Sequence, residues 1–142
     1  MLSEFIDSKV DFMLVGAYAL AAYGYPRATG DIDIWVRADK QTGALVYACL
    51  KQFGAPLHDL TIDDLSTPGM VFQIGVPPVR IDILTKSDRV LFEDAWRNRT
   101  NVDWDGMTIP IIGLADLIKN KRSTGRTKDL ADAEQLEANL DD

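Results

Sequence analysis

The sequence is poor in cysteine and histidine and has no long apolar run, and each shortage excludes a class of protein. Cys49 is the one cysteine and lies in a helical, apolar stretch, so an intramolecular disulfide is excluded and a cytoplasmic location is expected. His58 is the one histidine and has no cysteine near it, which argues against a zinc site. No apolar run approaches the roughly eighteen residues of a membrane-spanning helix, so no membrane partner is expected.

Positive charge is scarce as well. The formal net charge is -7 at pH 7, which argues against a general nucleic-acid-binding surface. Residues 1–5 have no basic region followed by an apolar core, so a secretory signal is not expected. One segment is nevertheless basic and suits a nucleotide's phosphates, the end of an RNA, or a solvated loop between two helices; it contains Lys119, Lys121, Arg122, Arg126 and Lys128.

The most informative feature is a pair of aspartates, Asp31 and Asp33, in an apolar strand pattern over residues 31–36. Side chains two apart on a strand share a face, so both carboxylates point one way. Neighbouring carboxylates repel each other and persist most easily where a cation such as Mg²⁺ or Mn²⁺ neutralises them. The alternative is a solvated pair, as expected for the second Asp-x-Asp at residues 103–105, which precedes a glycine.

The residues before this pair predict a strand, a tight turn and a helix. Residues 12–15 are apolar, Gly16 allows a sharp turn, and an alanine-rich helix over residues 17–23 follows. The first amide groups of a helix have no partner within it and favour an anion, so Gly16 and Ala17 are candidates to receive a nucleotide's phosphates. A plain connection between strand and helix is the alternative.

The order of strand, glycine turn, helix, Asp-x-Asp and a later strand with Asp82 resembles the polymerase β-like nucleotidyltransferase superfamily. The segments 16–20 and 27–33, with a C-terminal signature over 114–121 and 125–132, look like the small bacterial and archaeal members of toxin–antitoxin and abortive-infection systems. Members carry Gly-Gly or Gly-Ser after the first strand. This chain has Ala17 in the second position, so backbone amides must serve where many members offer a hydroxyl.

The resemblance implies two-metal transfer of an NMP, such as AMP or a pyrimidine nucleotide, from an NTP. Asp31, Asp33 and Asp82 are the implied catalytic residues and the ligands of Mg²⁺ or Mn²⁺, with Asp82 also the general base. For Arg80, a contact with phosphate and a salt bridge to the acids are equally good interpretations. The candidate nucleotide-binding residues are Gly16, Ala17, Arg27, Thr29, Arg80 and Lys121.

The acceptor implied by the resemblance is a hydroxyl of a partner protein or of an RNA end. The chain is short enough for part of the acceptor site to come from a separately encoded neighbour or a second copy of itself. The alternative function is a non-catalytic antitoxin or binding module that keeps the fold and acts by protein contact. The three acids favour the enzyme, whereas Ala17 is the one sequence feature that favours the alternative.

The length and pattern predict a single nucleotidyltransferase-like domain over residues 1–142, of the α+β class, with a small mixed sheet flanked by helices and a C-terminal helical pair. Ser87 or Asp88 is predicted to cap a helix that runs through Trp96. Asp129 and Asp132 are predicted to make pairs on a helix surface, with a role in bracing Lys121 left open. The expected strands are 12–15, 31–36, 70–76, 79–85, 101–104 and 107–111.

Overall fold

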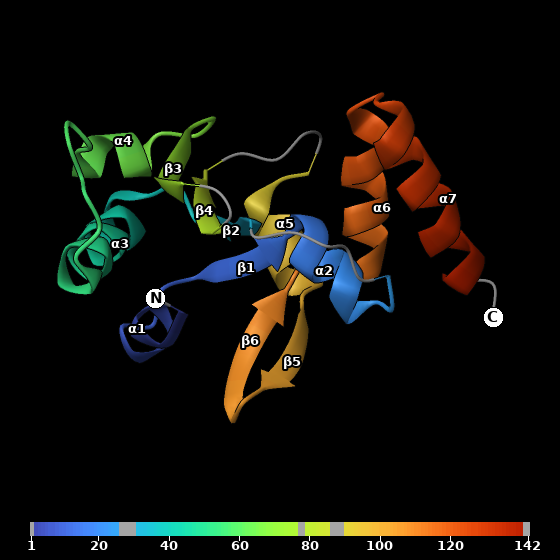
Figure 1. The fold of residues 1–142 in the computed structure, drawn as a ribbon, viewed down its shortest axis with the longest axis horizontal. Helices are drawn as coiled ribbons and strands as arrows, with labels where there is room; N and C mark the ends of the chain where they lie inside the picture. Colours follow the sequence, from blue (N-terminus) through green and yellow to red (C-terminus); the bar gives the residue numbers. More distant parts are fainter. Residues whose placement is uncertain (1, 26–30, 77–78, 86–89, 141–142) are drawn as a thin grey trace.

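A computed structural model describes residues 2–25, 31–76, 79–85 and 90–140, without the side chains of Val76, Val79, Asn139 and Leu140 (Figure 1). Its strands are β1 (Phe12–Val15), β2 (Asp31–Val36), β3 (Val71–Val76), β4 (Val79–Leu84), β5 (Thr100–Trp104) and β6 (Met107–Ile111). Its helices are α1 (Leu2–Asp7), α2 (Gly16–Ala22), α3 (Lys40–Phe53), α4 (Ile62–Ser66), α5 (Phe92–Arg97), α6 (Leu114–Ser123) and α7 (Thr127–Leu140).

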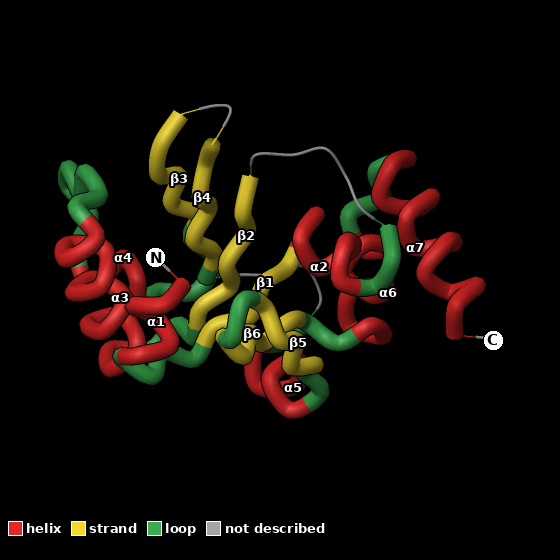
Figure 2. Tube along the Cα trace, turned by 60° about the horizontal axis from the view of Figure 1, so that its bottom comes forward, coloured by secondary structure: helices red, strands yellow, loops and turns green. Residues whose placement is uncertain are grey.

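The strands form one mixed sheet in the order β3-β4-β2-β1-β6-β5. β2 pairs with β4 and β1 with β6 in parallel, whereas the other neighbours are antiparallel. Helices α1, α3 and α4 lie at one end of the molecule and the pair α6–α7 at the other (Figures 1 and 2). The predicted α+β class, with a mixed sheet and a C-terminal helical pair, is confirmed.

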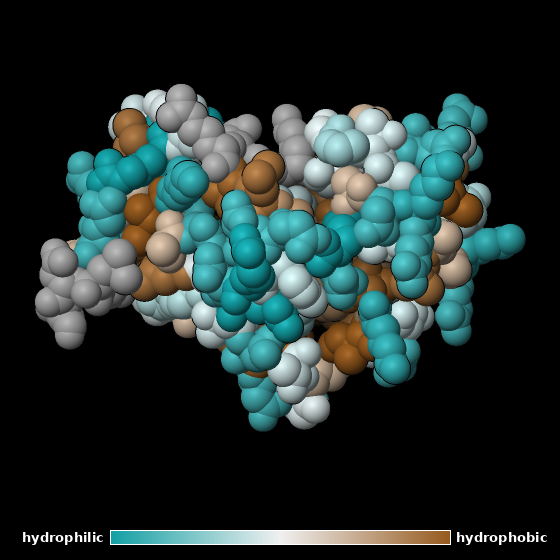
Figure 3. Space-filling view, turned by 180° about the vertical axis from the view of Figure 1, so that it is seen from behind, coloured by the Kyte–Doolittle hydropathy of each residue, from teal (hydrophilic) through white to brown (hydrophobic). Residues whose placement is uncertain are grey.

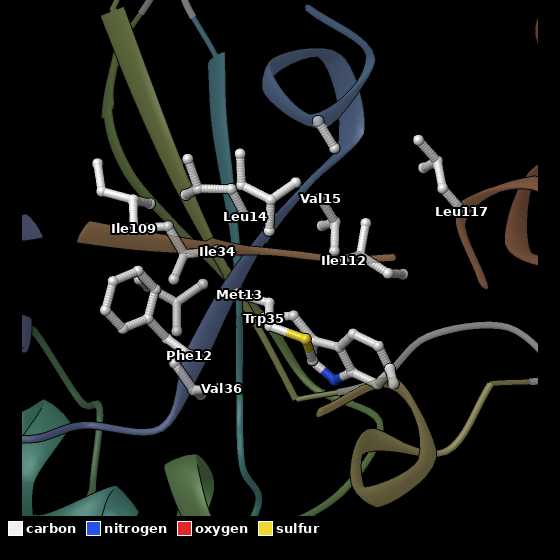
Figure 4. Close-up of a cluster of buried hydrophobic side chains, with 14 of the residues drawn as sticks. Phe12, Met13, Leu14, Val15, Ile34, Trp35, Val36, Ile109, Ile112 and Leu117 are labelled. Carbon is white, nitrogen blue, oxygen red and sulfur yellow. The ribbon is translucent and has the colours of Figure 1, made fainter. Parts of the chain in front are cut away.

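One face of the central strands is apolar because of strand alternation. Partners in register point to the same side of a sheet, so the pairing of Phe12 with Val36 and of Leu14 with Ile34 builds a continuous apolar surface. Phe5 of α1 packs edge-on against Phe12 with 5.6 Å between ring centroids. Figure 4 shows these strand side chains in one buried cluster with side chains from β6 and α6.

The opposite face of the same strands changes character along its length. At one end Trp35 packs against Phe92 of α5, with 5.3 Å between the ring centroids. Towards the start of β2 the same face carries Asp33 and Asp31 instead of apolar residues. The sheet is therefore closed by α5 at one end of this face and left polar at the other, which is where the candidate site lies.

Local sequence explains some of the element boundaries. Asp39 caps α3 by accepting a hydrogen bond from the Thr42 amide, and Gly54 ends that helix in the left-handed conformation with φ 86°. The β5–β6 hairpin turns at Asp105 and Gly106, both with positive φ, as the two central residues of such a tight turn require. The predicted hairpin is confirmed.

One predicted cap is wrong. Helix α5 begins at Phe92 and its cap position is Leu91, which makes no side-chain cap hydrogen bond. The first helical residue, Phe92, is partly buried and packs against Trp35, so an apolar contact lies at the start of the helix in place of a polar cap. Ser87 and Asp88 lie outside the described residues.

The back of the molecule is mainly hydrophilic (Figure 3). Figure 3 shows hydrophobic side chains on the back of the molecule in separate areas among hydrophilic ones. None of the helices in the described ranges has the length and apolar character needed to cross a membrane.

Candidate active site

The three acidic residues singled out in the sequence lie on one face of the sheet. In the parallel pair β2–β4, Asp33 is the direct partner of Asp82, and Asp31 is the partner of Arg80. Since register partners point to the same side, Asp31, Asp33, Arg80 and Asp82 form a two-by-two block of charged side chains. Three carboxylates from two strands therefore share a small area with one guanidinium.

The turn after β1 fits directly against this block. Gly16 has φ 66°, and a Cβ atom added to it would overlap Oδ2 of Asp33. Glycine is thus required here both for its backbone conformation and for the close approach of a carboxylate. Helix α2 begins at this glycine, and no side chain in the described residues caps its first turn. The first amides of α2 therefore lie beside the acids.

The charge of the block is incompletely balanced. Burial raises the pKa of Asp33 from 3.8 to about 6, and the charge of Asp82, a hydrogen bond with Asp82 and the charge of Asp31 act in the same direction. The positive charge of Arg80 opposes them but does not compensate. The site therefore favours an added proton or an added cation.

Arg80 bridges two of the three acids. Its Nη2 donates a hydrogen bond of 3.0 Å to Oδ2 of Asp31, and its Nε lies 3.3 Å from Oδ1 of Asp82. The second contact is an ion pair without hydrogen-bond alignment, because Nε and that Oδ1 are buried and have no hydrogen-bond partner among the described residues. In the described part of the chain, no three side chains of aspartate, glutamate, histidine or cysteine form a cluster that could hold a metal ion.

A cleft of about 580 Å³ opens beside the acids. One wall comes from the β1–α2 turn and the start of β2, and the other comes from the end of α6 and the start of α7. Asp82 and Arg80 do not line it, and Asp82 is only 8% exposed. The lining residues are Val15, Gly16, Ala17, Leu20, Asp31, Asp33, Leu84, Asn120, Lys121, Thr124, Arg126, Lys128, Asp129 and Asp132.

Lys121 is held in the far wall by two acids of the last helix. Its Nζ donates to Oδ1 of Asp129 at 3.2 Å and to Oδ2 of Asp132 at 3.3 Å. The prediction that Asp129 and Asp132 make pairs on a helix surface is wrong, because both are buried at 8% and 3% exposure. Of the two roles considered, bracing Lys121 is the one that the structure shows.

Asp129 is the centre of this contact network. The Thr124 hydroxyl donates to its Oδ2 at 2.8 Å, and Nε of Arg126 lies 2.8 Å from the same oxygen. Burial would raise the pKa of Asp129, but the Thr124 hydrogen bond and the charges of Lys121 and Arg126 outweigh it and lower the pKa below its usual value. Asp129 is therefore ionised at neutral pH and pairs with the Lys121 ammonium group.

Three of the five basic side chains of the segment form ion pairs with acids in the fold. Arg122 pairs with Glu137 and Arg126 with Asp129, in addition to the two acids around Lys121. No ion pair involves Lys119 or Lys128 among the described residues, and Lys128 lines the cleft. Little of this charge remains for an extended RNA contact.

The remaining predicted residues divide into two groups. Ala17 lines the cleft beside Gly16, where the sequence placed it. Arg27 and Thr29 lie outside the described residues. Two further lining residues, Asn120 and Thr124, were not predicted from the sequence. Their four-residue spacing around Lys121 would have placed them on one side of a helix.

No protein-family model and no curated protein matches the chain. Three solved structures are similar to it in fold. A Thermotoga maritima protein assigned as a nucleotidyltransferase is 19% identical with a TM-score of 0.59, over 99% of this chain and 90% of that one. The lincosamide antibiotic adenylyltransferase LnuA, with lincomycin bound, is 18% identical with a TM-score of 0.58, over 96% and 91%.

The third structure is the antibiotic-resistance factor ANT(2'')-Ia, which is 11% identical with a TM-score of 0.63, over 98% of this chain and 80% of that one. At these identities the likeness shows a shared fold. The chain therefore has the nucleotidyltransferase fold.

Proposed function

We propose that this protein is a nucleotidyltransferase that uses Mg²⁺ or Mn²⁺ to move an NMP from an NTP to a hydroxyl group. The observation that carries the proposal is the register of β2 and β4, which sets Asp33 beside Asp82 with Asp31 on the same face. The Gly16 turn lies against the Asp33 carboxylate at the edge of the cleft. Acids next to a glycine turn and a lysine-bearing wall suit a metal-bound triphosphate.

The donor atoms fit a hard divalent cation by type, and the three carboxylates would have to converge to bind it, because they do not form a cluster of metal ligands in the described residues. Every candidate ligand is a carboxylate oxygen, which is the ligand type that Mg²⁺ and Mn²⁺ prefer. Asp33 has a raised pKa, and Oδ1 of Asp82 is buried without a hydrogen bond from the described residues. Asp31, Asp33 and Asp82 would hold the ions, which supply neutralising charge for the triphosphate and the departing pyrophosphate.

The chain's own residues then have distinct tasks. The acceptor oxygen forms a bond to the α-phosphorus, the bond from that phosphorus to pyrophosphate breaks, and the hydroxyl proton passes to Asp82 as general base. Gly16 and Ala17 present backbone amides to the phosphates, and Lys121 faces them from the opposite wall. We assign Arg27, Thr29 and Arg80 to phosphate binding as well, by resemblance alone.

The proposed acceptor is a hydroxyl of a partner protein or of an RNA end, in a cytoplasmic toxin–antitoxin type of system. The pairing of Lys121, Arg122 and Arg126 with acids favours the protein over the RNA. LnuA, a neighbour in fold, is an antibiotic adenylyltransferase with lincomycin bound, so a hydroxylated small molecule is a third acceptor to test.

A non-catalytic binding module with the same fold is the second candidate. The specific observation in its favour is Ala17, which lines the cleft without the hydroxyl or the second glycine expected there. The intact block of three acids weighs against it, since a protein that acts by contact alone has no need to keep repelling carboxylates together.

The test uses each of the four NTPs labelled at the α-phosphate, with Mg²⁺ or Mn²⁺ and with protein extract, total RNA or lincomycin as acceptor. Labelled product that disappears in Asp33→Asn supports the transferase. Asp103→Asn is the matched control, because it changes the other Asp-x-Asp, which lies on the exposed strand β5. Absence of labelled product with all four nucleotides would favour the binding module.

A further inference from the structure

We propose that Arg80 competes with the divalent cation for the carboxylates of Asp31 and Asp82, so that the cation enters only as the guanidinium leaves. This inference rests on the proposed function, and it assigns Arg80 a role in setting the affinity of the metal site. It also joins the two interpretations of Arg80, since a guanidinium released from the acids is free to meet a phosphate.

Arg80 contacts the same two carboxylates that a divalent cation would use. Nη2 of Arg80 holds Oδ2 of Asp31 at 3.0 Å and Nε lies 3.3 Å from Oδ1 of Asp82. A cation shared by the three acids would use oxygens of these same two carboxylates. A guanidinium and a divalent cation repel each other, so each weakens the hold of the other on these two carboxylates. The two positive groups therefore compete.

The hold of Arg80 on Asp82 is imperfect. Both Nε of Arg80 and Oδ1 of Asp82 are buried, and neither has a hydrogen-bond partner in the described ranges. A buried ion pair without aligned hydrogen bonds recovers little of the cost of desolvating the two charges. The contact partly offsets the charge of Asp82, and a small, multiply charged ion would replace it readily.

Arg80 also has room to leave. Its side chain is 29% exposed, whereas that of Asp82 is 12% exposed. The partner of Arg80 on the outer strand β3 is Gly75, which has no side chain. The neighbour of Asp82 on β3 is Gln73, which carries a side chain beside the acid. Arg80 therefore has no side chain beside it on β3, whereas Asp82 does.

The test measures Mn²⁺ binding without nucleotide, from the electron paramagnetic resonance signal of free Mn²⁺. Arg80→Met keeps an apolar stem and removes the charge, and Arg80→Lys keeps a charge but places it on one nitrogen, without the planar guanidinium that contacts the two acids through separate nitrogens. Arg97→Met is the control, since Arg97 is exposed and pairs with Asp94 away from the cleft. Asp33→Asn is made in the wild-type and Arg80→Met backgrounds.

We expect Arg80→Met to tighten Mn²⁺ binding about tenfold or more, because a neighbouring charge shifts even proton affinity by about 1–3 pK units. Arg80→Lys should fall between Arg80→Met and the wild type, and Arg97→Met should bind as the wild type does. Binding by Arg80→Met no tighter than by the wild type, with Asp33→Asn weakening both, would overturn the competition and leave the metal site standing. Binding that Asp33→Asn does not weaken, or no binding at all, would overturn the metal site and the competition with it.

A measurement on the unaltered protein guards against misfolding of the variants. The Nε–H resonance of Arg80 should move as Mg²⁺ is added, whereas that of Arg37, which pairs with Asp11 outside the cleft, should stay. An Arg80 resonance that stays fixed while the carboxyl carbon of Asp33 responds to Mg²⁺ would overturn the proposal.

Discussion

Asp33 and Asp82 are direct register partners in the parallel pair β2–β4, and their proximity helps to raise the pKa of Asp33 to about 6. The fold thus holds two acids together that repel each other near neutral pH. Burial is the largest cause of the shift, and the charge of Asp82 is the next. This relationship gives the site both its proposed chemistry and a measurable cost in stability.

Asp33→Asn should make the protein more stable at pH 7.5 in the presence of EDTA. A carboxyl whose pKa is raised in the folded state contributes its stability below about pH 3.8 and loses it as the pH rises through about 6. With allowance for solvent screening of a partly exposed group, the gain is about 1–2 kcal/mol in the free energy of unfolding. Urea unfolding at pH 5 and pH 7.5 measures it.

Asp103→Asn, on the exposed hairpin, should leave that difference between the two pH values unchanged. An Asp33→Asn protein that is less stable than the wild type at pH 7.5 would contradict the account, because it would mean that Asp33 is well compensated without a cation.

Gly16→Ala should cost both stability and nucleotidyl transfer. The added Cβ would overlap Oδ2 of Asp33, and alanine disfavours φ 66°. Gly54→Ala is the matched control, since Gly54 has φ 86° but open space where a Cβ would go. We expect Gly54→Ala to lose about 1 kcal/mol with transfer unchanged, and Gly16→Ala to lose more and to abolish transfer.

Thermal unfolding and the labelled-NTP assay report the two effects of these glycine variants separately. Equal transfer by the two variants would show that the turn at Gly16 does not need its approach to Asp33.

Asp129→Asn should destabilise the protein by about 2–3 kcal/mol at pH 7, because it removes an acid from Lys121, whose side chain is only 11% exposed. The lowered pKa of Asp129 gives stability that is present above about pH 3.8 and is lost as the pH falls through the lower folded value. The variant should therefore lose less stability than the wild type on acidification. Denaturant unfolding from pH 7 to pH 3 measures both effects.

Arg122→Met is the control for this prediction, since its pair with Glu137 is on the surface, where screening by solvent leaves an ion pair little effect on stability. If Asp129→Asn were no more destabilising than Arg122→Met, the network around Lys121 would be a surface feature rather than an anchor.

The sequence was sufficient for the features that depend on local periodicity. Strand alternation put Asp31 and Asp33 on one face, and glycine with an alanine-rich stretch identified the β1–α2 turn. The partnership of Asp33 with Asp82 depends on the register between strands far apart in the chain, which periodicity alone does not fix. The resemblance to known nucleotidyltransferases implied that Asp82 joins Asp31 and Asp33, and the structure gives the register.

Side-chain contacts were the least predictable part of the site. The hold of Arg80 on both Asp31 and Asp82 follows from strand register, and the burial of Asp132 against Lys121 follows from the packing of α6 on α7. Neither is visible in one helix or strand taken alone. The same holds for α5, where packing of Phe92 on Trp35 lies at the start of the helix in place of a polar cap.

The central claim is that Asp31, Asp33 and Asp82 together hold divalent cations beside a nucleotide in the cleft. Its most direct test is the anomalous diffraction of Mn²⁺ in crystals grown with a non-hydrolysable NTP analogue. The account predicts Mn²⁺ within coordinating distance of these three carboxylates and the triphosphate between the Gly16 turn and Lys121. Mn²⁺ bound elsewhere, or a nucleotide that avoids the cleft, would contradict it.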